Sequence, residues 1–253
     1  MPITPDSTRT QIVAAIPAKI ATYNAAYPAY NVTYGAFIAA RAAGIAAAGS
    51  LAAWLATPDA APAFIALLDS FGMNARNSEL VAPAVFAANL ADLPAVPLLA
   101  AVPFPIGTIA AIEPQLRTIF NCCAAPGTFS KSGGFVIGSK TAHCVLPDLC
   151  PMLDNEHIGK SLYNIAREQY LPPGNNWAAY LGRPVVNPPN PSPRGAGRNN
   201  WDAHRFTQAI GFYEALYSDW QAANGNLGIG AFLGLDPTAG TTGIFRVLDK
   251  VLW

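Results

Sequence analysis

The chain has 253 residues, of which 52% are hydrophobic and only 12% are charged, with 15 basic and 15 acidic side chains. This composition excludes an intrinsically disordered chain, and the net charge of zero excludes the global basic field that usually marks a nucleic-acid-binding protein. Much of the apolar fraction is Ala, which favours helices over strands.

Helical periodicity recurs through the first half of the chain. We expect helices over residues 10–27, Tyr34–Leu55, Asp59 to Gly72, Ser78–Leu90 and Ile109–Cys122. Pro17 is expected to kink the first of these helices. Residues 94–107 carry four prolines and therefore predict a buried loop or a broken helix.

A Pro-rich stretch interrupts the second half. His157–Tyr170 has near-helical spacing, whereas Leu171–Asn199 contains seven prolines and predicts a long loop. We expect Asp202 to cap a long amphipathic helix, and Thr241 or Thr242 to cap the last helix.

Alternating apolar and polar residues, the mark of strands, are scarce. The sequence therefore predicts an all-α fold, a single multi-helix globular domain over residues 1–253 that divides, if at all, into sub-lobes 1–116 and 117–253. The second part carries eleven basic and nine acidic groups, so a modest local positive surface is expected there.

The four cysteines, Cys122, Cys123, Cys144 and Cys150, lack the spacing of a metal site and are interpreted as buried thiols. The Ala-rich run over residues 36–56 contains Arg41 and two glycines, so we interpret it as a packed helix and not a membrane span. The N-terminal residues lack the pattern of a signal peptide. We expect a cytoplasmic monomer with no metal, no cofactor and no membrane partner.

The segment from Lys131 to Asp154 carries the most chemical information. Gly133, Gly134 and Gly138 permit a tight turn, after which Ser139 is expected to cap a helix that starts at Lys140. Amides at such a helix start bind anions such as phosphate. A lysine in that first turn has its pKa lowered by the helix dipole, as a nucleophilic amine requires.

Simpler interpretations of the same residues exist. Lys140 would be an ordinary solvated lysine, and Asp154 would only cap the helix that follows at His157. His143 is expected to be a packing residue. Phe245 and Trp253 fit either the core or a pocket in which a base stacks.

The run VIGSKTAHC followed by PMLD resembles the helix-hairpin-helix DNA glycosylases, especially bacterial proteins of the 8-oxoguanine glycosylase type. The pattern spans Ser139, Lys140, His143, Pro147, Asp148, Leu149, Pro151 and Asp154. The family is all-α. The resemblance implies a DNA glycosylase, with or without AP-lyase activity, that excises an oxidised purine such as 8-oxoguanine from damaged double-stranded DNA.

The resemblance also implies roles for individual residues. Lys140 would attack the sugar to form a Schiff base, and Asp154 would stabilise positive charge on that sugar. Phosphates would be contacted by Gly134, Gly138, Ser139, His157, Arg194 and Arg198. The alternatives are a non-catalytic nucleic-acid-binding protein of similar fold and a helical protein-interaction module, which would leave Lys140 facing solvent.

Overall fold

The structure is a computed structural model that describes residues 8–74, 79–107, 109–154, 197–238 and 243–253. All regular secondary structure in these ranges is helical, apart from isolated bridges that join Ser130 to Leu80 and Pro126. The all-α prediction is confirmed. The expected helix over His157–Tyr170 and most of the Pro-rich loop lie outside the described residues.

Six helices form the first half: α1 (Arg9–Ala26), α2 (Pro28–Ala48), α3 (Leu51–Leu55), α4 (Ala60–Ser70), α5 (Pro83–Ala91) and α6 (Val96–Leu99). The single helix expected over Tyr34–Leu55 is wrong, because the chain breaks between α2 and α3. Gly49 adopts a left-handed φ of 83°, and the Ser50 hydroxyl then caps α3 by accepting from the Ala53 N–H.

The second half contains η1 (Ile109–Ala111), α7 (Glu113–Ala124), α8 (Phe135–Val145), α11 (Gly197–Ala223), α12 (Ile229–Leu233) and α13 (Ile244–Leu252). Asp202 does not cap α11, which begins at Gly197; it forms an ion pair with Arg205 at 3.4 Å instead. The cap of α13 is Gly243, not Thr241 or Thr242. A Cβ at Gly243 would lie 2.4 Å from the Pro147 carbonyl oxygen, so no larger residue fits this cap.

Helices α7 and α8 are joined by a turn that requires glycine. Gly133 and Gly134 have φ angles of 65° and 118°, and the Gly134 N–H donates to the Ala124 carbonyl at 2.7 Å. A Cβ at Gly138 would lie 2.6 Å from that of Ala124, so this glycine lets the two helices pack closely. The glycine-rich turn was predicted, and its assignment as a helix-hairpin-helix element stays a prediction.

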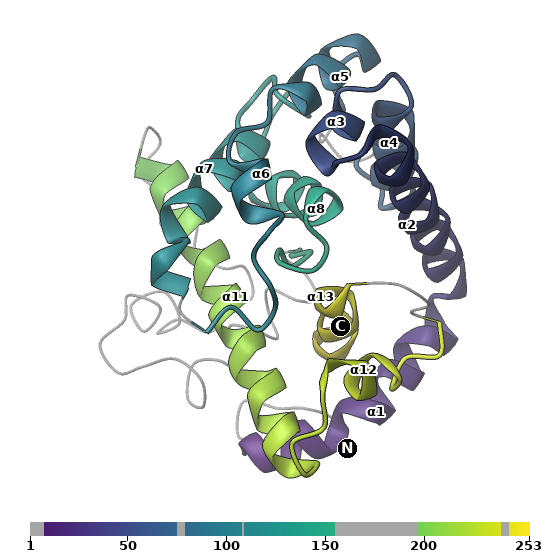
Figure 1. The fold of residues 1–253 in the computed structure, drawn as a ribbon, viewed down its shortest axis with the longest axis vertical. Helices are drawn as coiled ribbons and strands as arrows, with labels where there is room; N and C mark the ends of the chain where they lie inside the picture. Colours follow the sequence, from purple (N-terminus) through teal and green to yellow (C-terminus); the bar gives the residue numbers. More distant parts are fainter. Residues whose placement is uncertain (1–7, 75–78, 108, 155–196, 239–242) are drawn as a thin grey trace.

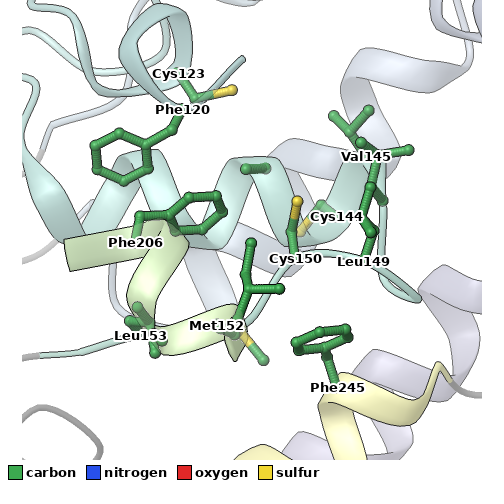
Figure 2. Close-up of a cluster of buried hydrophobic side chains, with 14 of the residues drawn as sticks. Phe120, Cys123, Cys144, Val145, Leu149, Cys150, Met152, Leu153, Phe206 and Phe245 are labelled. Carbon is green, nitrogen blue, oxygen red and sulfur yellow. The ribbon is translucent and has the colours of Figure 1, made fainter. Parts of the chain in front are cut away.

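Helix α13 lies in the interior, with all nine of its residues buried. Figure 1 shows α13 in yellow inside a ring formed by α1, α2, α8 and α11. Residues 146–153 pass between α8 and α13. Figure 2 shows Cys144, Cys150 and Met152 gathered between α8 and Phe245 of α13. The core therefore converges on the segment that carries the predicted catalytic residues.

Two further expectations concern the cysteines and the membrane. The four thiols are free, and Cys123, Cys144 and Cys150 are buried as predicted, while Cys122 is half-buried. Burial raises the pKa of Cys144 to about 12, so this thiol stays protonated. Among the described helices, none combines the length and the hydropathy that crossing a bilayer requires.

Candidate functional site

A pocket lies where four helices and two connecting segments meet, and the predicted nucleophile borders it. Its lining consists of four aromatic rings, two cations and one thioether, from Tyr23, Tyr30, Phe71, Lys140, Met152, Arg246 and Trp253. The enclosed volume is about 40 Å³, room for a few water molecules and far below the roughly 300–1,000 Å³ of a typical ligand pocket. The pocket is therefore too small for an ordinary small-molecule ligand in this structure.

Lys140 is almost fully buried, with 8% of its surface exposed. Its Nζ lies 5.3 Å from the centre of the Phe71 ring, a cation–π geometry. Burial lowers the pKa of the Lys140 amine, and the positive charge of Arg246 lowers it further. The negative charge of Asp154 opposes this shift, so the structure brings the predicted pair into electrostatic contact.

The low pKa was predicted, but its expected cause is wrong. Helix α8 starts at Phe135 with Gly134 as its N-cap, so Lys140 lies in the second turn and Ser139 caps nothing. The helix includes Phe135–Ile137, which precede the expected start, and it begins directly after Gly134, whose positive φ is not helical. Desolvation takes the place of the helix dipole as the force on Lys140.

The expected phosphate donors have partners within the protein. The Gly134 amide donates to Ala124, and the Gly138 amide donates to the Gly134 carbonyl at 3.0 Å. Ser139 is fully buried. The first-turn amides that helix geometry leaves open are those of Phe135, Val136 and Ile137.

Three side chains hold the backbone of residues 150–153, which leads directly to Asp154. The Ser139 hydroxyl bonds both backbone groups of Leu153, and the Met152 N–H donates to Asp249 at 3.2 Å. His143 bonds the Cys150 carbonyl through Nδ1 at 2.7 Å. These contacts hold the segment against α8 and α13. They therefore fix the position of the backbone that leads into Asp154.

His143 joins this segment to α2 as well. A carbonyl only accepts, so the Nδ1 of His143 must carry the proton that it donates to Cys150. The Nε2 of the neutral ring then accepts from the Tyr34 hydroxyl at 2.7 Å. Burial lowers the pKa of His143 to about 3, which keeps the ring neutral. The predicted packing role of His143 agrees with this position.

Helix α13 contributes buried charged residues beside the site, and the sequence patterns did not predict their burial. Arg246, Asp249 and Lys250 have exposed fractions of 1%, 0% and 2%. Asp249 accepts from the Tyr213 hydroxyl at 2.8 Å, and burial raises the pKa of this carboxyl to about 7. Lys250 forms a buried ion pair with Asp236 at 2.5 Å.

The remaining expected residues divide between the site, the core and the undescribed part of the chain. Trp253 borders the pocket, whereas Phe245 packs in the core against Phe104 and Tyr213. His157 and Arg194 lie outside the described residues. Arg198 lies in the first turn of α11, and its side chain is outside the described part.

Several pocket residues carried no chemical signal in the sequence. Tyr23, Tyr30 and Phe71 occur at ordinary positions near helix ends, and nothing in their spacing distinguishes them from core aromatics. Arg246 gave one usable sign, since it is a charge within the most apolar stretch of the C-terminal segment.

Known proteins provide no further assignment. Comparisons with protein-family models, with curated proteins and with solved structures give no match. Function is therefore inferred from the geometry of the pocket and from the motif resemblance.

Proposed function

We propose that this chain is a DNA glycosylase, with or without AP-lyase activity, that excises an oxidised purine such as 8-oxoguanine through a Schiff base on Lys140. The observation that carries the proposal is the burial of Lys140 in an aromatic pocket, where its amine has a lowered pKa. A neutral amine is the nucleophilic form of lysine.

Burial of Lys140 also separates this proposal from the protein-interaction alternative. That alternative expects Lys140 to face bulk solvent, and only 8% of the residue is exposed. A solvated lysine loses nothing by staying charged, whereas burial of a lysine costs stability, and groups held at that cost are found preferentially at functional sites. The position of Lys140 therefore favours catalysis.

The proposed reaction begins with a damaged purine turned out of the duplex. The Lys140 amine attacks C1′ of the sugar as the bond to the base breaks, and loss of a proton and ring opening give the Schiff base. Asp154 stabilises the positive charge that develops on the sugar. The amides of Phe135, Val136 and Ile137, in the first turn of α8, would hold a phosphate of the same strand.

Borohydride trapping tests this proposal. The protein is incubated with a duplex that contains one 8-oxoguanine, and the Schiff base is then reduced to a stable adduct. We expect an adduct with the wild-type chain and none with Lys140→Met. Lys131→Met is the matched control, because Lys131 is exposed and pairs with Glu79 away from the pocket.

The same samples are assayed for free base, which separates the two activities. Base release without an adduct means a glycosylase that uses water instead of Lys140. The absence of both an adduct and base release, across a panel of oxidised-purine duplexes, would contradict the proposal.

A further inference from the structure

Arg246 is a buried cation to which the proposed chemistry has so far given no role. Its guanidinium lies over the rings of Tyr23 and Tyr34, at 4.9 Å and 5.1 Å from their centres. One nitrogen, Nη2, donates to the Tyr23 hydroxyl at 2.7 Å. These contacts hold the guanidinium plane in place beside the Lys140 pocket.

Among the described residues, no ion pair balances the charge of Arg246. Within the described part of the chain, no carboxylate lies within ion-pair distance, and the buried Nε has no hydrogen-bond partner. Asp249, one turn away, already accepts from Tyr213 and Met152, and its burial favours the neutral carboxyl although the charge of Arg246 opposes this. An arginine cannot escape burial by losing its proton, so an unpaired one is costly unless a ligand completes it.

The surroundings of Arg246 indicate what that ligand is. Two basic side chains, Arg246 and Lys140, border a space whose other walls are mainly aromatic rings. The guanidinium of Arg246, which keeps its proton, selects negative charge, and ring faces select a flat aromatic partner. A planar heteroaromatic anion meets both conditions, whereas a simple phosphate would use the guanidinium and leave the rings without a role.

We infer that Arg246 is a catalytic residue that receives the purine as it departs as an anion. This inference rests on the proposed glycosylase function. When the C1′–N9 bond breaks, its electron pair stays on the base, and Arg246 donates hydrogen bonds to the resulting anion. The new C1′–N bond uses the lone pair of Lys140, and the proton that this nitrogen then releases neutralises the base.

Asp154 is not part of the pocket lining, and its charge acts on Lys140, whereas Arg246 borders the pocket itself. The pocket must open for a purine to enter, since its volume is about 40 Å³. Tyr30, Phe71 and Trp253 are half-buried, so they form the part of the pocket wall that is nearest to solvent.

Equilibrium binding of two free purines tests the inference without DNA. Urate is an anion at neutral pH, and adenine is neutral. We expect the wild-type chain to bind urate about tenfold more tightly than adenine, the effect of one or two hydrogen bonds to a charged group. Calorimetric titration gives both affinities. Arg246→Gln should abolish the preference, and Arg246→Lys should retain part of it.

Arg41→Gln is the matched control. Arg41 is a second arginine packed among helices, but it donates to the Val145 carbonyl and borders a separate pocket. We expect this variant to keep the urate preference. If Arg246→Gln fails to fold, Arg246→Lys decides the question, and an unchanged urate preference in that variant overturns the role of Arg246.

The outcomes distinguish the proposed role of Arg246 from the proposed glycosylase activity. Equal affinity for urate and adenine, binding of neither, or an unchanged preference in Arg246→Gln overturns the role of Arg246. A urate preference in a chain that releases no base from DNA supports the anion site and rejects the glycosylase. Base release without a urate preference does the reverse.

Discussion

The Ser139 hydroxyl satisfies both backbone groups of Leu153: it donates to the carbonyl at 2.8 Å and accepts from the N–H at 3.2 Å. Lys140 follows Ser139 on α8, and Asp154 follows Leu153 on the facing segment. One hydroxyl therefore connects the two residues of the predicted catalytic pair through their immediate neighbours in the chain.

Replacing Ser139 should weaken the fold measurably. In Ser139→Ala two buried backbone groups lose their partner, and we expect the free energy of unfolding to fall by about 1–3 kcal/mol. Urea denaturation measures this change. Ser132→Ala is the control, since Ser132 is exposed and its loss should cost less than about 0.5 kcal/mol. Equal losses in the two variants would show that the Ser139 contacts are not stabilising.

Stability should fall in mild acid because of His143. Its pKa is about 3 in the fold and 6.5 in the unfolded chain, so between these values the unfolded state binds the extra proton. The contribution of the neutral His143 ring to the free energy of unfolding is complete above pH 6.5. It is lost as the pH falls, by up to about 1.4 kcal/mol per pH unit.

His143→Gln cannot take up this proton, which isolates the effect. We expect the stability difference between wild type and His143→Gln to shrink steadily from pH 7 to pH 4 in urea titrations. Parallel pH profiles for the two proteins would contradict the assignment of a neutral buried imidazole.

Asp249 should act in the opposite direction. Its pKa is raised to about 7 from 3.8, so the folded state holds a proton that the unfolded state has already released. Its contribution to stability is therefore complete below pH 3.8 and is lost as the pH rises toward 7.

Asp249→Asn cannot ionise, and its side chain can still bond Tyr213 and Met152. Relative to wild type, we expect this variant to gain stability between pH 4 and pH 8, by up to about 1.4 kcal/mol per pH unit. Thermal unfolding across this range measures the gain. The exposed Asp92→Asn is the control and should show no such trend.

Lys140 should reduce stability. Lys140 is buried with its Nζ over the Phe71 ring, and Met would fill the same space beside Phe71 without a charge. We expect Lys140→Met to raise the free energy of unfolding by about 0.5–2 kcal/mol, while it removes the trapped adduct. Lys131→Met should change stability by less than about 0.5 kcal/mol. A clear destabilisation by Lys140→Met would mean that the lysine is structural.

Local signals in the sequence predicted much of the fold. Periodicity located most helices, and the positive φ of Gly133 and Gly134 explains why the turn before α8 could be recognised. The start of α8 was misplaced because Ser139 and Lys140 resemble a cap and a first turn. Nothing in the local sequence shows that Ser139 is instead needed by Leu153, a tertiary partner.

The charged side of α13 was not predictable from the sequence for a related reason. Arg246, Asp249 and Lys250 recur at the spacing of one helix face, which in an isolated helix indicates exposure to solvent. Their partners come from distant segments, such as Tyr23 for Arg246 and Asp236 for Lys250. Burial of this face depends on contacts that no single segment encodes.

The bond between Arg246 and Tyr23 joins residues 223 positions apart in the chain. Closing so long a loop costs entropy before any contact compensates it, so such pairings form late in folding. The environment that lowers the pKa of Lys140 therefore does not exist in a nascent or partly folded chain. Until α1 and α13 meet, the pKa of this lysine stays at its ordinary value, so the property on which the proposed chemistry depends is acquired only with the complete fold.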